Sequence, residues 1–244
     1  MNLKRVTIIT ARSKSSRFPN KILETITPKY KSIDILIERA KKIGLPIILA
    51  TSNLKADDYL CNYVKKKHNI KIFRGSNKNK IERWYKCFKK FKADVACMID
   101  GDDLCFDYNL YKKYKGKNFF YGYPSNLITG VFLNIINYES IKKMHKHSKN
   151  FKDTEMIKPF IKKSKIKVKL IDSPKIYQNK KIRLTFDYVE DLYFFKAIFK
   201  KFNIKKETLK IVKFLTKNEN ISKINYFREA AWKNNQSRKI KSLA

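Results

Sequence analysis

The sequence predicts one α/β domain built around a mainly parallel central sheet. Short apolar runs alternate with segments of helical periodicity through the first half of the chain, and strands joined by helices usually pair in parallel. The chain has 244 residues, of which 43% are hydrophobic, so it can bury a substantial core. No repeat, low-complexity linker or shift in composition marks a boundary. We therefore expect residues 1–244 to form a single domain.

The first half carries the regular part of this alternation. Apolar runs predict buried strands at residues 6–11, 46–51, 70–73 and 95–99. Apolar residues at helical spacing predict helices over residues 33–43, 56–68 and 80–91. Gly44 directly follows the first of these helices and suits its C-terminal cap.

The second half is less regular. Apolar runs predict strands at residues 118–123, 131–136, 168–171 and 184–187. Helices are predicted from residue 138 onward and over residues 152–163, 190–202 and 207–223. The last stretch, residues 224–244, is predicted to be a polar tail.

A basic loop follows the first predicted strand and contains Arg12, Lys14, Arg17 and Lys21, with Ser15 among them. Guanidinium groups bind phosphate oxygens through paired hydrogen bonds, and an ammonium adds a mobile charge. Open α/β sheets place ligands at the carboxyl ends of their strands. The loop therefore has the chemistry of a polyphosphate site. In a chain with 57 Lys and Arg residues, its charge alone also fits a solvated loop.

Carboxylates follow two later strands. Asp100, Asp102 and Asp103 come after one strand, and Asp187 and Asp191 after another, although the chain has only 21 Asp and Glu residues. Nucleotide sites usually hold Mg²⁺ through one or two carboxylates, phosphate oxygens and water. Asp191 also fits the first turn of a helix, and Asp103 a turn, which leaves Asp102 and Asp187 as the stronger metal candidates. Without a metal ion, these two carboxylates are expected to repel each other.

The order of residues in the basic loop resembles the start of the sugar cytidylyltransferases. The resemblance is closest to the spore coat polysaccharide biosynthesis protein F group, which is related to the enzymes that activate Kdo and sialic acid. Asn20 replaces the glycine of the family pattern, and Asn tolerates the positive φ that glycine supplies. The matching residues are Ala11, Arg12, Ser15, Arg17, Pro19 and Lys21.

Further segments appear in the same order as in that family, at residues 48–52, 73–76, 130–135 and 155–161. Two motifs resemble those that carry the family's metal ligands. The first is Gly101 followed by Asp102, with Asp103 and Leu104 in place of the usual Cys-Pro. The second is residues 185–192, which contain Asp187. The resemblance therefore assigns Asp102 and Asp187 to one Mg²⁺ ion.

The resemblance implies a three-layer, Rossmann-like nucleotidyltransferase fold of the glycosyltransferase-A-like type, with a mixed, mainly parallel sheet. It implies a Mg²⁺-dependent enzyme that transfers CMP from CTP to an acidic or unusual sugar and releases pyrophosphate, for surface polysaccharide or glycan biosynthesis. Residues 118–180 would form the sugar pocket and a homodimer contact region. The implied catalytic residues are Arg12, Lys21, Asp102 and Asp187. The implied nucleotide-binding residues are Ala11, Arg12, Ser15, Arg17, Lys21, Ser52, Arg74 and Ser76.

Other functions are weighed against this one. The net charge of +36 also fits a non-catalytic protein of the same fold that binds nucleic acid or an acidic polymer. The lysines are spread along the whole chain, as AT-rich codon use would produce, so no specific nucleic acid is expected. Guanylyl or uridylyl transfer would normally show a Gly-rich loop, and residues 13–17 contain no glycine. P-loop, dinucleotide-binding and nucleophile-elbow motifs are absent from the sequence, and His145 and His147 have no third metal ligand nearby.

The sequence also predicts a cytoplasmic protein. Its four cysteines form no C-x-x-C pair, as expected for reduced thiols. About six apolar residues precede Arg12, fewer than the core of a signal peptide needs. No stretch approaches the roughly 18 apolar residues of a membrane-spanning helix.

Overall fold

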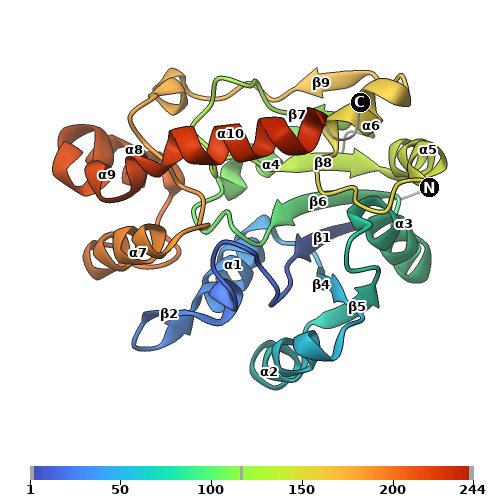
Figure 1. The fold of residues 1–244 in the computed structure, drawn as a ribbon, viewed down its shortest axis with the longest axis horizontal. Helices are drawn as coiled ribbons and strands as arrows, with labels where there is room; N and C mark the ends of the chain where they lie inside the picture. The colour runs from blue at the N-terminus through green and yellow to red at the C-terminus, as the bar shows by residue number, and fades with distance from the viewer. Residues whose placement is uncertain (1–2, 116–117, 242–244) are drawn as a thin grey trace.

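The computed structural model describes residues 3–115 and 118–241, and a seven-stranded sheet lies at its centre (Figure 1). The strands lie in the order β5-β4-β1-β6-β8-β7-β9. β8 runs antiparallel to both neighbours, and the other described pairs of this sheet are parallel. Strands β2, Thr25–Thr27, and β3, Tyr30–Lys31, form a separate hairpin. The strands of the central sheet are β1 Arg5–Thr10, β4 Ile47–Ser52, β5 Lys71–Gly75, β6 Val95–Asp100, β7 Phe120–Gly122, β8 Asn134–Asn137 and β9 Val168–Leu170.

Two hydrophobic cores, one on each face of the sheet, produce three layers. Because side chains alternate along a strand, Ile9 and Leu49 face one core while Ile8 and Ile48 face the other. Helices α1, α2, α4, α7 and α8 cover the first core, and α3, α5 and α6 cover the second. The helices are α1 Ser32–Ala40, α2 Asp58–His68, α3 Lys80–Phe91, α4 Tyr108–Tyr114, α5 Tyr138–Ser148, α6 Lys158–Lys163, α7 Val189–Lys201, α8 Thr208–Lys217, α9 Glu219–Tyr226 and α10 Arg228–Lys241. Short 3₁₀ turns lie at Lys21–Leu23, Lys41–Ile43, Lys55–Asp57 and Lys175–Gln178.

The predicted fold class is confirmed, and the first half agrees closely with the sequence. Strands β1, β4, β5 and β6 fall where apolar runs predict them, within one or two residues. Gly44 has φ 79° and ends the turn after α1, as predicted for a glycine cap. The described helices include none long and apolar enough to cross a membrane. All four cysteines are free and buried.

Several predictions for the second half are wrong. Residues 184–187 are not a strand, because their N–H groups donate to loops: Leu184 to the Thr129 carbonyl at 2.8 Å and Phe186 to the Asp102 carbonyl at 2.8 Å. The helix predicted over residues 152–163 begins only at Lys158, where Pro159 suits the first turn.

The single helix predicted over residues 207–223 is divided into α8 and α9. Asn218 leaves the helical conformation between them, and its side-chain amide donates to the Phe214 carbonyl at 2.8 Å. The Phe214 carbonyl, in the last turn of α8, thereby accepts a hydrogen bond that the backbone would donate if the helix continued.

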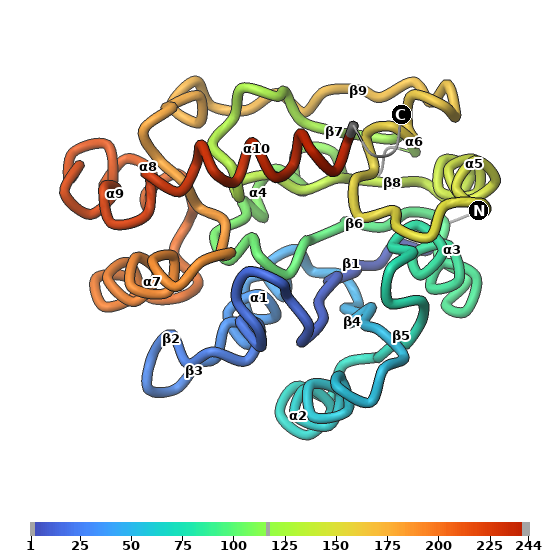
Figure 2. Tube along the Cα trace, viewed as in Figure 1, coloured from blue at the N-terminus to red at the C-terminus, as the bar shows by residue number. Residues whose placement is uncertain are grey.

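The predicted polar tail is instead mostly the helix α10, which crosses in front of the sheet (Figures 1 and 2). Near its start, Glu229 Oε2 lies 3.0 Å from Arg183 Nη1. Near its end, Lys239 Nζ lies 2.6 Å from Glu155 Oε2. The helix is mostly polar because ion pairs and the cleft, rather than an apolar core, hold its inner face, where Trp232 and Ile240 are the apolar exceptions.

The carboxyl ends of β1 and β6 approach each other closely. Gly101, directly after β6, donates its N–H to the Thr10 carbonyl at 2.9 Å. A Cβ at this position would lie 2.9 Å from that carbonyl oxygen and 2.9 Å from Ala11 Cβ. Only glycine fits here, and the contact places Asp102 beside the start of the basic loop.

Candidate active site

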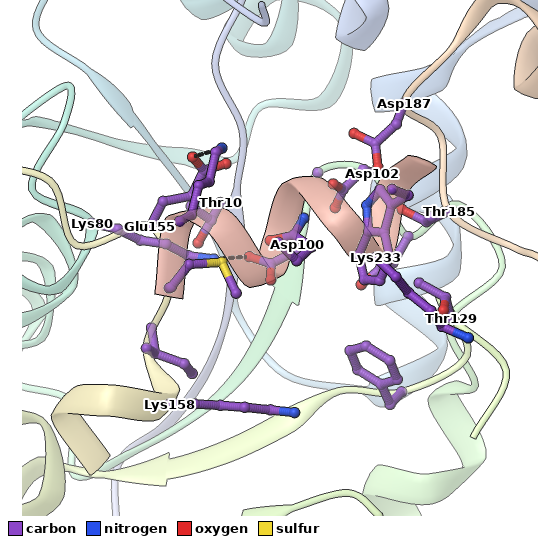
Figure 3. Close-up of a pocket in the computed structure, with 18 of the residues that line it drawn as sticks. Thr10, Lys80, Asp100, Asp102, Thr129, Glu155, Lys158, Thr185, Asp187 and Lys233 are labelled. Atoms are coloured by element: carbon purple, nitrogen blue, oxygen red, sulfur yellow. Dashed lines mark hydrogen bonds and ion pairs between the residues drawn. The ribbon is translucent and has the colours of Figure 1, made fainter. Parts of the chain in front are cut away.

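A cleft of about 720 Å³ opens at the carboxyl ends of β1 and β6 (Figure 3). The loop after β1 forms one side of it, and the turn after β6 forms its floor. Residues 123–134, residues 155–158 and α10 form the opposite side. Segments far apart in the sequence therefore meet in one cavity, at the sheet edge where open α/β folds bind ligands.

The basic loop is fixed at both of its ends. Asn20 adopts a left-handed conformation with φ 57°, as its replacement of glycine predicts, and donates its N–H to the Ser13 carbonyl at 2.9 Å. Ser13 donates its own N–H to Asp57 Oδ1 at 2.6 Å, and Thr51 Oγ1 donates to Asp57 Oδ2 at 3.0 Å. Burial opposes ionisation of Asp57, but hydrogen bonds from Ser52 and Ser13 leave its pKa below the ordinary value. This buried carboxylate, which sequence reasoning missed, joins the loop to β4 and α2.

The five residues of this loop that are implied to bind nucleotide, Ala11, Arg12, Ser15, Arg17 and Lys21, all line the cleft. Arg12 Nη1 donates to the carbonyl and side-chain oxygens of Asn77, at 2.8 and 3.1 Å. These contacts hold the guanidinium against one wall of the cleft.

The other three implied nucleotide-binding residues do not line the cleft. The Ser52 side chain is buried and donates to Asp57. Arg74 pairs with Asp58 at 2.5 Å and donates to the Ser52 carbonyl, so it joins β5 to α2. Ser76 Oγ accepts from the Asn79 N–H at 3.1 Å, next to the start of α3. The structure thus gives these side chains contacts that support the loops around the cleft.

Asp102 and Asp187 are brought together around one ammonium group. Lys21 Nζ lies 2.8 Å from Asp187 Oδ1 and 3.6 Å from Asp102 Oδ2. The two carboxylates therefore face the same point in the cleft, beside each other in Figure 3. Two further cations contact Asp187: Arg17 at 2.6 Å and Arg183 at 3.4 Å.

The two carboxylates have opposite electrostatic environments. Asp187 is fully buried, which alone would raise its pKa, but Lys21 and Arg17 bring that pKa well below the ordinary value. Burial raises the pKa of Asp102 to about 6; Lys21 opposes this rise, and Asp187 adds to it. Burial and the neighbouring Asp102 also raise the pKa of Asp103. The repulsion expected from the sequence therefore acts on Asp102, whereas cations outweigh it at Asp187.

Ion pairs also line the far end of the cleft. Lys80 Nζ contacts Asp100 Oδ1 at 2.6 Å (Figure 3). The same ammonium lies 4.8 Å from the centroid of the Trp84 ring. Hydrogen bonds from Arg83 to the Ser76 and Asn77 carbonyls, at 2.6 and 3.2 Å, hold the Asn77 segment in place. Asp100, the additional carboxylate of this sequence, is thus neutralised by its own lysine and lies apart from the Lys21 contact.

Sequence reasoning also missed Arg183 and α10. Arg183 is fully buried and contacts three carboxylates: Asp187, Asp191 at 3.2 Å and Glu229 at 3.0 Å. A signal for α10 was present, because its cleft-lining residues recur at helical spacing. They are Glu229, Trp232, Lys233, Gln236, Ser237, Lys239 and Ile240.

Asp102 and Asp187 suit a Mg²⁺ ion that takes its remaining ligands from phosphate and water. Among residues 3–115 and 118–241, no group of three or more His, Cys, Asp or Glu side chains is arranged to hold a metal ion. A site of two carboxylates completed by a nucleotide is consistent with that finding. His145 stacks on Tyr85 with ring centroids 4.3 Å apart, which is a packing role.

Comparison with known proteins decides the family. The sequence model of the cytidylyltransferase family matches residues 6–233. The chain belongs to the cytidylyltransferase family. The family resemblance found in the sequence is thereby confirmed, and the chain is a nucleotidyltransferase by that membership.

Two relatives match this cytidylyltransferase over most of its length. Protein MJ1063 of Methanocaldococcus jannaschii is 32% identical over 235 residues, which cover 91% of this chain and 95% of the relative. The spore coat polysaccharide biosynthesis protein SpsF of Bacillus subtilis is 24% identical over 207 residues, covering 80% and 85%.

Two solved structures share the fold. A cytidylyltransferase from Leptospira borgpetersenii has a TM-score of 0.77 at 22% identity, covering 90% of this chain and 97% of that one. A CMP:2-keto-3-deoxy-manno-octonic acid synthetase, complexed with CTP, has a TM-score of 0.60 at 13% identity, covering 81% and 99%. The Rossmann-like nucleotidyltransferase fold predicted from the sequence is confirmed.

Proposed function

We propose that this cytidylyltransferase transfers CMP from CTP to a hydroxyl group of an acidic sugar, in the cytoplasm, with Mg²⁺ as cofactor, for surface polysaccharide or glycan biosynthesis. The observation that carries the proposal is the meeting of Asp102, Asp187 and Lys21 in one cleft with Arg12 and Arg17. The synthetase complexed with CTP and the spore coat polysaccharide protein among the similar proteins support CTP and the sugar.

In the proposed reaction, the sugar hydroxyl oxygen forms a bond to the α-phosphorus of CTP. The bond from that phosphorus to the bridging oxygen of the β-phosphate breaks, pyrophosphate leaves, and the hydroxyl proton is released. Arg12, Arg17 and Lys21 bind the β- and γ-phosphates through charge-assisted hydrogen bonds and hold the α-phosphate in line with the hydroxyl. Asp102 and Asp187 would hold Mg²⁺, which supplies positive charge to the triphosphate oxygens and lowers the pKa of the attacking hydroxyl.

The other side of the cleft fits the sugar. The Tyr123 and Phe132 rings stack with centroids 3.4 Å apart, and Phe132 and Trp232 line the cavity. Lys158 and Lys180 line the same side, and neither forms an ion pair with any described residue. Apolar rings suit the carbon face of a sugar, and two unpaired ammonium groups suit its carboxylate or another anionic substituent.

Pyrophosphate release tests the proposal. The purified protein is incubated with CTP, UTP, GTP or ATP, each with and without Mg²⁺, and with a panel of ulosonic, uronic and neutral sugars. We expect release that needs CTP, Mg²⁺ and an acidic sugar together. Saturable binding of all four triphosphates with equal affinity and no pyrophosphate would instead indicate a basic protein that binds polyanions.

A further inference from the structure

The protein itself supplies a cation between Asp102 and Asp187. The Lys21 ammonium contacts both carboxylates and also donates to the Phe186 carbonyl at 2.6 Å. Its side chain is only 12% exposed. The ammonium therefore belongs to the floor of the cleft and bridges the two segments that carry the carboxylates.

Lys21 and a divalent cation would compete for this position. A metal ion held by both carboxylates would lie within a few ångströms of the ammonium, where like charges repel strongly in a partly buried site. Lysine carries its charge on a flexible stem and can move it to a new partner. A triphosphate in the cleft offers such a partner, because the backbone of Lys21 belongs to the phosphate-binding loop.

Arg17 differs from Lys21 in a way that singles out the lysine. Its guanidinium contacts Asp187 but forms no hydrogen bond or ion pair with Asp102, and it also lies over the Tyr188 ring at 5.7 Å. Arg183 likewise contacts Asp187, but from the buried side, together with Asp191 and Glu229. Asp187 therefore keeps two cationic partners when Lys21 leaves, whereas the ion pair of Asp102 is lost.

We propose that Lys21 is the resident counter-ion of the metal site and that nucleotide binding releases it. Without nucleotide, the ammonium occupies the two carboxylates and keeps divalent cations out. When a triphosphate binds, Lys21 moves to its phosphates, and the metal ion and nucleotide enter together. This inference rests on the proposed function. It adds that metal binding and nucleotide binding depend on each other through Lys21, which the transfer reaction itself does not require.

Mn²⁺ binding to the nucleotide-free protein, followed by electron paramagnetic resonance at pH 7.5, tests the inference without any sugar. Lys21→Met should bind Mn²⁺ about tenfold more tightly than the wild type, as expected when one charge-assisted contact to the carboxylates is removed. Lys78→Met removes one positive charge from the same cleft, at an exposed lysine to which no ligand is assigned, and should leave Mn²⁺ affinity within about twofold of the wild type, since exposed charges contribute little. Adding Asp187→Asn to Lys21→Met should remove the gain, which assigns the bound Mn²⁺ to this site.

Two further titrations make the test decisive. Lys21→Arg keeps the charge and should keep Mn²⁺ binding as weak as in the wild type. CTP should strengthen Mn²⁺ binding to the wild type. Equal Mn²⁺ affinity of the nucleotide-free wild type and Lys21→Met would overturn the inference. If Lys21→Met does not fold, tight Mn²⁺ binding by the nucleotide-free wild type at Asp187 would overturn it. A lack of CTP binding would instead contradict the proposed function, while the nucleotide-free titrations would still decide the role of Lys21.

Discussion

The two sides of the cleft balance their charges in different ways. On the phosphate side, formed by the loop after β1 and the turn after β6, two aspartates already pair with lysines of the protein, Asp187 with Lys21 and Asp100 with Lys80. Arg12, on the same side, contacts only the uncharged oxygens of Asn77. On the helix side, formed by residues 123–134, 155–158 and 179–182 together with α10, Lys158 and Lys180 have no ion-pair partner among the described residues, although Lys233 and Lys239 of α10 pair with glutamates. A ligand must displace a carboxylate partner to bind Lys21, whereas it can bind Lys158 or Lys180 directly.

This difference matters because pairing decides what a substitution costs. Removing one partner of a buried pair leaves a charge without compensation, which costs about 3–5 kcal/mol. Removing an exposed, unpaired lysine affects only the ligand that it binds. We therefore expect changes to the paired residues of the phosphate side to alter both stability and catalysis, and changes to unpaired residues of the helix side to alter one substrate's affinity alone.

Asp187→Asn should have the largest effect. It removes a proposed metal ligand together with the partner of Lys21 and Arg17. We expect pyrophosphate release to fall by roughly 10³-fold, and urea unfolding to show a loss of about 3 kcal/mol. The double variant with Asp102→Asn should be hardly slower than Asp187→Asn, because two ligands of one ion act as a unit. Multiplicative losses in the double variant would show that the two carboxylates act separately.

Arg12→Ala should have the next largest effect on activity. It tests a cation of the phosphate side that is not paired with a carboxylate. The guanidinium contacts uncharged oxygens of Asn77, so its loss leaves no buried carboxylate unpaired. CTP affinity, measured by calorimetry, should fall by about ten- to a hundredfold with little change in stability. Lys66→Ala, on the exposed face of α2, is the matched control for bulk charge. An equal loss of CTP affinity in the control would mean that net charge, rather than the loop, binds the triphosphate.

The comparison of the two sides also explains what could be read from the sequence. The phosphate side follows short-range rules: a buried strand, a basic loop and an aspartate after the next strand. Arg12, Lys21 and Asp102 were found because each lies in a short motif after a predicted strand, although their contacts with Asn77 and Asp187 join distant parts of the sequence. Asn20 was assigned a left-handed conformation from residue type alone, and it has φ 57°.

The helix side depends on contacts between distant segments, which local patterns do not record. Residues 184–187 alternate like a strand, yet their hydrogen bonds go to the carbonyls of Thr129 and Asp102. Gly130, with φ 93°, permits this close approach, because a Cβ there would lie 2.3 Å from Leu184 backbone atoms. Arg183 and α10 were missed for the same reason: ion pairs, rather than an apolar stripe, hold α10 in place.

Trp232→Ala, on the helix side, should have a moderate effect confined to the sugar. Trp232 is the only tryptophan lining the described cleft, and its indole N–H is buried with no partner in the described protein. Steady-state kinetics should show a KM for the sugar about tenfold higher and a KM for CTP within about twofold of the wild type, the loss typical of one stacking contact. Equal increases in both KM values would show that α10 also contributes to nucleotide binding. The cleft would then not be divided into a nucleotide-binding side and a sugar-binding side.

Asp102→Asn should have the smallest effect on stability, and the sign of that effect differs from the sign for Asp187→Asn. The folded-state pKa of Asp102 is about 6, whereas the unfolded value is about 3.9. Between these values the folded protein keeps a proton that the unfolded chain has lost, so the stability due to Asp102 falls as the pH rises from about 4 to about 6. Since the side chain is 31% exposed, screening by water limits this loss to about 1 kcal/mol. Asp187 has the opposite sign, because its lowered pKa stabilises the folded state above about pH 4 and loses that effect in acid.

Urea unfolding at pH 4 and 7.5 should therefore find Asp102→Asn more stable than the wild type only at pH 7.5, where Asp187→Asn is less stable. If both variants were less stable than the wild type at pH 7.5, Lys21 would be stabilising both carboxylates equally, and the asymmetry between them would be absent.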